Sequence, residues 1–298
     1  MADLLNIVAV GLLLGGIYAL VSVGLNLIFG VIRVVNFAQG EFVMLGMYGT
    51  FAVSAATGLD PYLGVVVVVP ALFVLGALVQ RLVLSRLRAE PAMQIFATFG
   101  LLLLLQNVVL AVTRGTAYSV NTPVSQISVG LGTVQIGLSR VIVLLAATAV
   151  TLVLGLWLQR STLGRAIRAV AQDQRAATLM GVNTDRVYML SFGFGIGAGL
   201  AGLAGCLLAP LYTMSPQIGT NFILPAFAVV VLGGLGSVGG AYVGGLMVGM
   251  IEALAGYYLD PALKHAVLFA VFIAVLVVRP SGLFGQAGAE EVGLREQS

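Results

Sequence analysis

Long tracts without a charged residue or a histidine constrain this chain more than any other feature of its sequence. A helix needs ~20 apolar residues to cross the hydrocarbon core of a bilayer. With 60% hydrophobic and only 8% charged residues, the chain also lacks the polar side chains that would cover a water-soluble domain. The sequence therefore predicts an integral membrane protein. Tracts that contain no Asp, Glu, Lys, Arg or His include residues 4–32, 91–113, 141–159, 187–251 and 266–278.

These tracts predict an all-α, polytopic transmembrane helical bundle of about eight or nine spans. The segment 221–236 is short enough to be re-entrant. No soluble domain fits between two spans, so we expect residues 1–285 to form a single transmembrane domain, followed by a cytoplasmic tail at 286–298. The expected helices cover residues 5–29, 37–56, 62–80, 94–113, 140–159, 187–210, 221–236, 240–258 and 263–279.

Arginines predict how the bundle is oriented. The loop 81–90 carries three arginines and the loop 160–186 carries five, whereas the other connections hold little beyond Arg114, Arg140 and Lys264. Because cytoplasmic loops carry the excess of Arg and Lys, both arginine-rich loops are expected in the cytoplasm. The N-terminus is then outside and the C-terminus cytoplasmic. This topology accounts for the net charge of +3 without any nucleic-acid partner.

Glycines recur at a spacing of four residues in several expected spans. Small residues on one helical face allow two helix backbones to come into van der Waals contact. These faces can pack inside one bundle or against another subunit, and the spacing alone leaves both open. The motifs are Gly11-x-x-x-Gly15, Gly195-x-x-x-Gly199, Gly236-x-x-x-Gly240-x-x-x-Gly244 and Gly245-x-x-x-Gly249.

The cytoplasmic loop STLGRAIRAVAQDQRAATLMGVNTDRV, residues 161–187, is the most informative polar segment. From Gly164 to Met180 its apolar and charged residues predict one amphipathic helix. Gly181 is placed to end that helix in the left-handed conformation, and Asn-Thr-Asp at 183–185 offers N-caps for the next span. Such a helix can lie in the membrane interface or insert into a groove on a cytoplasmic partner.

The sequence holds no nucleotide-binding or catalytic motif. Lys264 is the only lysine, and no G-x-x-x-x-G-K-[ST] surrounds it, so no P-loop is expected. No cluster suits a metal and no nucleophile has a neighbouring base, so neither a cofactor nor an enzymatic activity is expected. Three classes remain: a permease subunit driven by separate ATPases, a stand-alone ion-coupled carrier or channel, and a membrane-embedded enzyme. A carrier would need charged residues within its spans to relay ions, and Glu41 and Glu252 are the only candidates.

Four segments resemble the permease subunits of branched-chain amino acid ABC importers of the LivH type. They are VNFAQGEFVMLG (35–46), GRAIRAVAQDQRAATLMGVNTDRV (164–187), VVLGGLGSVGGAYVGGLMVGMIEAL (230–254) and RPSGLFG (279–285). The resemblance implies a multi-pass permease of the cell inner membrane that translocates branched-chain or similar small amino acids, with urea or short amides as the alternative cargo. It also implies a second permease of the LivM type, two cytoplasmic ATP-binding subunits and an extracytoplasmic amino-acid-binding protein as partners, with membrane lipid around them.

By the same resemblance, residues 164–181 match the coupling loop of ABC importers. The family pattern has Glu-Ala-Ala followed by a Gly four residues after the second Ala. Here Arg175 stands where the Glu would be, which leaves the detailed contact with the ATPase open. The residues implied in ATPase coupling are Gly164, Arg165, Arg168, Asp173, Ala176, Ala177 and Gly181.

Four polar side chains at membrane depth are candidates for the translocation path: Asn36, Gln39, Glu41 and Glu252. Asn36 and Gln39 also fit a capping box at a helix start, where Glu41 would be favoured by the helix dipole. Family members commonly have His in place of Gln39, so a titrating role cannot be carried over. Glu252 must face a partner or a wet cavity, since an unpaired carboxylate is costly in the membrane. Structural and path roles stay open for all four.

Overall fold

The computed structural model describes residues 2–32, 35–87, 90–131, 134–188, 194–259, 263–279 and 282–284. The expected tail 286–298 and the first part of the helix expected at 187–210 include positions outside these ranges. Every other expected span is present as a helix with nearly the expected bounds. The sequence thus located the helices correctly.

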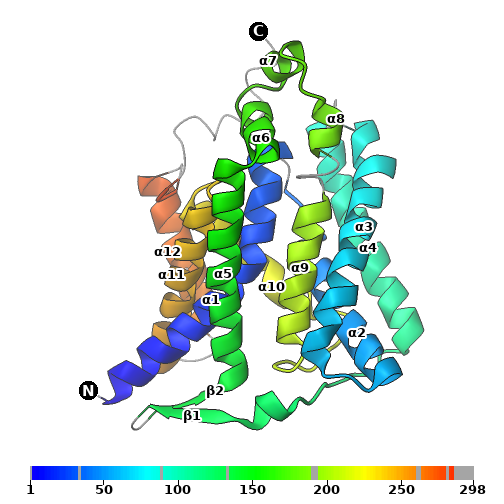
Figure 1. Cartoon of the computed structure of the whole chain (residues 1–298). Helices are drawn as coiled ribbons and strands as arrows, with labels where there is room; N and C mark the ends of the chain where they lie inside the picture. The colour runs from blue at the N-terminus through cyan, green and yellow to red at the C-terminus, as the bar shows by residue number, and fades with distance from the viewer. Residues whose placement is uncertain are drawn as a thin grey trace.

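The described helices form one bundle, with α1 and α11 crossing near its centre (Figure 1). Within the described ranges, five segments are long and apolar enough to cross a membrane: Asn6–Gly30, Pro61–Leu87, Ala92–Thr113, Leu138–Arg160 and Val238–Tyr258. The helices are α1 (Ala2–Ile32), α2 (Gln39–Thr57), α3 (Val65–Leu82), α4 (Pro91–Thr113), α5 (Leu138–Arg160), α6 (Thr162–Gln172), α7 (Gln174–Leu179), α8 (Thr184–Val187), α9 (Phe194–Leu208), α10 (Thr220–Gly233), α11 (Val238–Tyr258) and α12 (Lys264–Val278). Short 3₁₀ turns are η1 (Pro61–Gly64), η2 (Leu84–Leu87) and η3 (Pro123–Gln126).

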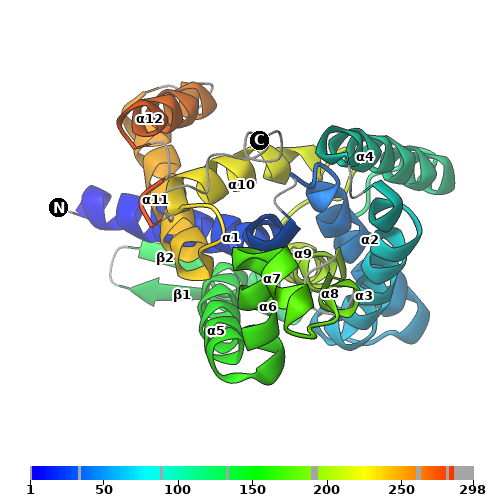
Figure 2. The ribbon, with the colours of Figure 1, turned by 90° about the horizontal axis from the view of Figure 1, so that it is seen from above.

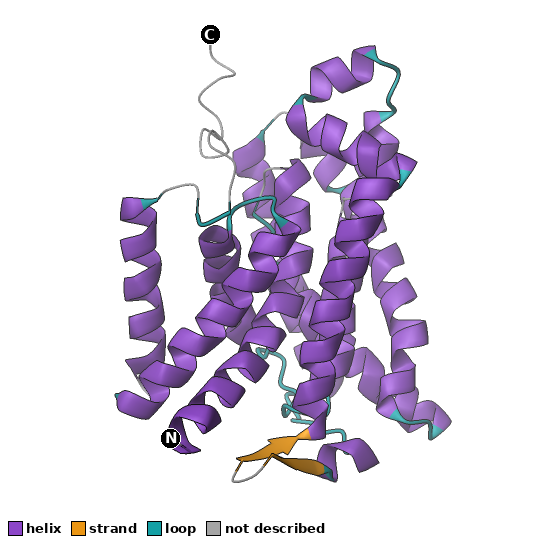
Figure 3. Cartoon of the chain, turned by 60° about the vertical axis from the view of Figure 1, so that its left-hand side comes forward, coloured by secondary structure: helices purple, strands orange, loops and turns teal. Residues whose placement is uncertain are grey.

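One element departs from the all-α expectation. β1 (Ser128–Leu131) and β2 (Val134–Gly137) pair antiparallel, with Ser128 opposite Gly137. The hairpin lies at the same end of the molecule as the N-terminus, opposite α6, α7 and α8 (Figure 3). A hairpin satisfies the backbone N–H and C=O groups of a loop outside the bundle, so the helical membrane-depth body is unaffected.

The glycine faces of α1 and α11 pack against each other inside the chain. A Cβ added to Gly15 would lie 2.6 Å from the Cα of Leu246, and one added to Gly245 would lie 2.6 Å from the Cα of Ala19. Gly249 in turn faces the backbone of Gly15. Without side chains between them, the backbones of both helices come into direct contact. For these two motifs the interpretation as packing within one bundle is confirmed.

The helix α10 is short, and most of its residues are buried. Its 14 residues extend about 21 Å, less than the ~30 Å of the hydrocarbon core. Seen from above, it runs across the middle of the bundle (Figure 2). Its first turn meets the start of α2, since a Cβ on Gly219 would lie 2.7 Å from the carbonyl carbon of Gly40. Two helices therefore begin side by side in the interior.

The turn between α10 and α11 is closed by two distant segments. The Asn26 side-chain amide on α1 donates to the carbonyls of Gly234 and Ser237, and its oxygen accepts from the N–H of Gly236 at 2.6 Å. From the C-terminal segment, the N–H of Leu283 donates to the carbonyl of Leu232 at 2.9 Å. Free carbonyls at the end of α10 are thereby satisfied without water.

Candidate coupling surface and interior polar cluster

The helix α6 is fixed to the bundle along one face. Ser161 caps it by accepting a hydrogen bond from the N–H of Gly164 at 2.8 Å. Ile167 and Val170, one turn apart, are buried in a cluster that includes Leu27 of α1. This spacing is that of an amphipathic helix with its apolar side on the protein. A displacement of α6 would therefore act directly on α1.

The end of α5 is the second attachment point. A Cβ added to Gly164 would lie 2.7 Å from the carbonyl carbon of Leu158, so α6 passes against the last turn of α5 without a side chain between them. Arg168 donates to the carbonyls of Leu158 and Gln159. A guanidinium at this position satisfies free carbonyls and suits the negative end of the helix dipole. Gly164 and Arg168 therefore connect α6 to α5.

The single helix expected from Gly164 to Met180 is wrong in one detail: the chain breaks at Asp173. This residue is extended, with φ of −151° and ψ of 106°, and ends α6. Its carboxylate accepts the N–H of Ala176 at 2.9 Å and so caps α7. An Asp that offers its side chain to the backbone favours a helix start over a helix interior. The candidate coupling segment is consequently two helices with a bend between them.

The end of α7 has the expected geometry. Gly181 has φ of +83°, and the N–H groups of Gly181 and Val182 donate to the carbonyls of Thr178 and Ala177. This pair of bonds is the Schellman motif, which glycine adopts without strain. Asn183 then caps α8 by accepting from the N–H of Arg186 at 2.9 Å. Both sequence predictions for this turn are confirmed.

An exposed apolar tip is the feature that the sequence reasoning missed. Leu179 is 88% exposed and Met180 is 84% exposed, at the far end of α7. Of the other residues implied in coupling, Arg165 and Ala176 are exposed and Ala177 is buried. Two large apolar residues directly before a C-terminal glycine were the available signal. Exposed apolar side chains at the tip of a charged segment suit a contact with another protein.

Asn36 and Gln39 form a turn at the start of α2, but not a capping box. The oxygen of Asn36 accepts the N–H of Ala38 at 3.0 Å, two residues on, which is an Asx-turn. The side chain of Gln39 bonds the amide of Asn36 and donates to the carbonyl of Gly197 on α9 at 3.2 Å. The Gln39 oxygen, which a capping box would offer to the backbone N–H of Asn36, thus accepts from the side-chain amide of Asn36 instead. Both side chains are completely buried.

Glu41 lies in the first turn of α2, and only one of its oxygens is paired. It is 1% exposed. Gln106 of α4 donates to Oε1 at 3.0 Å, whereas Oε2 has no hydrogen-bond partner among the described residues. The sequence did not single out Gln106, because the α2–α4 contact cannot be read from spacing within either helix.

Glu252 lies elsewhere and has two partners. Lys264 of α12 approaches Oε1 at 2.7 Å, and Tyr18 of α1 donates to Oε2 at 2.5 Å. The carboxylate side chain is 2% exposed and that of the lysine 40%. Glu252 thus joins α1, α11 and α12 and is not brought together with Asn36, Gln39 and Glu41.

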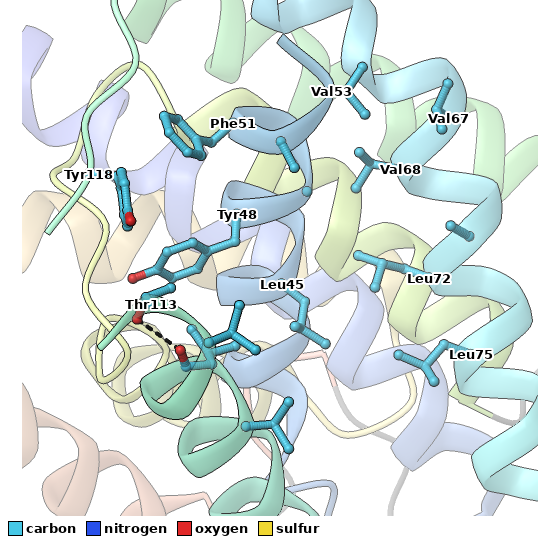
Figure 4. Close-up of a pocket in the computed structure, with 16 residues that line it drawn as sticks. Leu45, Tyr48, Phe51, Val53, Val67, Val68, Leu72, Leu75, Thr113 and Tyr118 are labelled. Carbon is cyan, nitrogen blue, oxygen red and sulfur yellow. Dashed lines mark hydrogen bonds between the residues drawn. The ribbon is translucent and has the colours of Figure 1, made fainter. Parts of the chain in front are cut away.

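An apolar groove of about 590 Å³ lies between α2, α3 and α4 (Figure 4). Its lining includes Leu45 and Tyr48 of α2, Leu72 of α3 and Val109 of α4. Leu45 follows Glu41 by one helical turn, so the groove continues from the Glu41–Gln106 contact along the same face of α2. Among the described residues no group of three or more His, Cys, Asp and Glu side chains could hold a metal ion.

Comparison with known proteins identifies the family. The model for the permease component of the branched-chain amino acid transport system matches residues 7–276. The chain belongs to this family. It is 35% identical to LivH of Escherichia coli K12, a high-affinity branched-chain amino acid transport permease, over 95% of this chain and 96% of that protein. BraD of Pseudomonas aeruginosa, a permease with the same description, is 32% identical over 95% of this chain and 96% of its own length.

A more distant relative has a different cargo. The ribose import permease RbsC of Escherichia coli K12 is 27% identical over 86% of this chain and 81% of its own length. No solved structure matches the chain. The resemblance seen in the sequence motifs is confirmed: this permease is a multi-pass membrane transport subunit of an ABC transporter family.

Proposed function

We propose that this permease is the transmembrane subunit of an ATP-driven importer that carries branched-chain or similar small amino acids across the cell inner membrane. The relatives LivH and BraD support the cargo, because both cover nearly the whole chain. In this proposal residues 1–285 form one transmembrane domain with the N-terminus outside and the C-terminus in the cytoplasm. The arginine-rich loops support that orientation.

The observation that carries the proposal is the apolar tip of α7 on a rigidly attached α6. Two cytoplasmic ATP-binding subunits supply the energy, and one of them receives Leu179 and Met180 in a groove. Helix-in-groove docking buries apolar side chains at fixed positions, and the αL turn at Gly181 sets the direction in which the chain leaves the groove. Asp173 bends the segment so that α7 extends away from the bundle.

The attachment of α6 explains how ATP binding could act on the membrane-depth helices. A movement of α7 passes through α6 to the end of α5 by way of Arg168 and to α1 by way of Ile167. Since α1 packs backbone to backbone against α11, the helices α1, α5 and α11 move as one body. Alternating access then follows from ATP-driven bias between two arrangements of the subunits.

The remaining partners complete the importer. A second permease of the LivM type faces this chain, the path runs between the two, and a soluble extracytoplasmic protein delivers the amino acid. Asn36 and Gln39 shape the interior start of α2 beside the path, and Glu41 borders the path itself. Glu252 has a structural role in this proposal, since both of its oxygens are paired within the chain.

The test is assembly and transport by a tip variant. Changing Leu179 and Met180 together to aspartate should leave membrane insertion intact but reduce co-purification of the ATPases and ATP-dependent leucine uptake at least tenfold. The control is Leu59→Asp, because Leu59 is also exposed, at 51%, but lies between α2 and η1, away from α7. Uptake by the permease alone, driven by a proton or sodium gradient and indifferent to ATP, would overturn the proposal.

A further inference from the structure

Glu41 is a buried acid without a cationic partner among the described residues. It is 1% exposed, and its hydrogen-bond partner among the described residues is the neutral amide of Gln106, which donates to Oε1. The second oxygen has no hydrogen-bond partner in the described part of the chain. Buried polar atoms of folded proteins are nearly always paired, and an exception at membrane depth calls for a ligand or a partner.

Glu252 shows how the same chain satisfies an acid that has a structural role. It receives the ammonium group of Lys264 on one oxygen and the hydroxyl of Tyr18 on the other. Both acids are nearly inaccessible, and both lie within helices of the bundle. The difference between them is the missing cation at Glu41, and charge complementarity therefore points to a positively charged group that arrives from outside the chain.

The surroundings of Glu41 would suit a small amino acid. A Cβ added to Gly219 would lie 2.9 Å from Oε1 of Glu41, so the carboxylate lies beside the first turn of α10. The apolar groove lined by Leu45 and Val109 begins one helical turn away on α2 and α4. A polar anchor next to an apolar groove is the usual arrangement of a site that orients an amphipathic ligand.

We propose that Glu41 binds the ammonium group of the transported amino acid, with the free carboxylate oxygen as its acceptor and the aliphatic side chain directed toward the groove between α2, α3 and α4. This inference rests on the proposed function and names the residue that recognises the cargo within the membrane. Gln106 is a positioning residue, because it holds Oε1 and leaves Oε2 for the ligand.

Access to Glu41 requires α4 to move, and α4 has few buried residues to hold it in place. Few of its apolar residues are buried: Phe96 is 69% exposed and Val112 is 79% exposed. Its described polar contacts with α2 and the segment before it are the Gln106–Glu41 bond and the hydrogen bonds of Thr98 near Phe37. A few hydrogen bonds and limited packing hold α4 in place, which is typical of an element that opens locally.

The test is the thermal stability of the assembled complex, with this permease, its partner permease and the ATPases, in detergent. Leucine should raise the melting temperature, whereas 2-hydroxy-4-methylpentanoate, which lacks the ammonium group, should not. Glu41→Gln keeps a hydrogen-bonding partner for Gln106 but removes the charge. This variant should melt at the same or a higher temperature without leucine, and should need at least tenfold more leucine for half of the stabilisation. Glu90→Gln, at an exposed acid, is the control and should behave as the parent.

Several results would overturn the inference. They are an unchanged leucine response in Glu41→Gln, a lower melting temperature of that variant without leucine, or no response of the parent complex to leucine. Equal stabilisation by the hydroxy analogue, or by sodium or ammonium chloride, would show that the amino acid is not what Glu41 recognises. ATP-dependent leucine import by the parent complex tests the proposed function separately. Import with an unchanged Glu41→Gln response removes only the role of Glu41.

Discussion

Replacing Gly245 by alanine should force apart the two helices at the centre of the bundle. The new Cβ would lie 2.6 Å from the Cα and N of Ala19 on α1 and 2.7 Å from its Cβ. Ordinary carbon contacts are about 3.5–4 Å, so α1 and α11 would have to separate by about 1 Å. These three neighbours are two backbone atoms and a Cβ, none of which can rotate away. Overpacking of this kind costs about 1–3 kcal/mol, and we expect the upper end of that range.

Gly256 on the same helix provides the matched control, because a Cβ there would meet nothing within 4 Å. Gly256→Ala should be neutral or stabilise the helix by about 0.5–1 kcal/mol. The two variants should therefore differ by about 2–4 kcal/mol in the free energy of unfolding. Titration of the purified permease with SDS, followed by circular dichroism, measures this difference. Equal stability of the two variants would refute direct backbone contact between α1 and α11.

Three further predictions concern the coupling turn, the ion pair and the orientation. Gly181→Val places a β-branched residue at φ of +83°, which costs about 1–2 kcal/mol. Less of the ATPases should then co-purify with the permease. Assembly at the wild-type level would argue against a role for this turn. Glu252→Gln should lower the free energy of unfolding by about 1–3 kcal/mol, and Tyr18→Phe should lower it by about 1 kcal/mol. Both effects are measured as the yield and stability of the folded complex. Reduced uptake by a fully stable complex would instead indicate that Glu252 lines the translocation path. In a background without the native cysteine, an impermeant thiol reagent should label a cysteine at Ser125 in intact cells but not one at Thr178, and the reverse pattern would invert the topology.

Much of the fold could be predicted because a membrane-depth helix must satisfy its backbone internally and expose apolar side chains. The charge-free tracts report both requirements directly, which is why helices such as α5 and α11 were located nearly at their observed bounds. The turn at Gly181 was also predictable, since the conformation that ends the helix there is favoured by glycine itself.

The errors arose where a local preference competed with another bond. At Asp173 the pattern of apolar residues continued through the break, but the carboxylate satisfies the N–H of Ala176 and so starts a new helix. At Gln39 the side-chain oxygen that a capping box would use accepts from the Asn36 side chain, while the amide of Gln39 donates to the carbonyl of Gly197, 158 positions along the chain. The spacing of residues along the chain shows neither how strongly Asp173 favours a helix start nor that Gly197 lies beside Gln39.

The segment RPSGLFG near the end of the chain also forms a hydrogen bond with a residue far away in the sequence. Leu283 lies in RPSGLFG, and Leu232 in the motif 230–254, yet the two share a backbone hydrogen bond at 2.9 Å. A Cβ on Gly282 would meet the Cα of Gly234 at 2.9 Å, so this contact needs glycine on both sides. Since α10 ends inside the bundle, its last carbonyls have no water to bind, and Asn26 and the C-terminal segment take its place. The two motifs therefore form one structural unit, which fixes the C-terminal end of α10 while its other end begins beside Gly40 and Glu41.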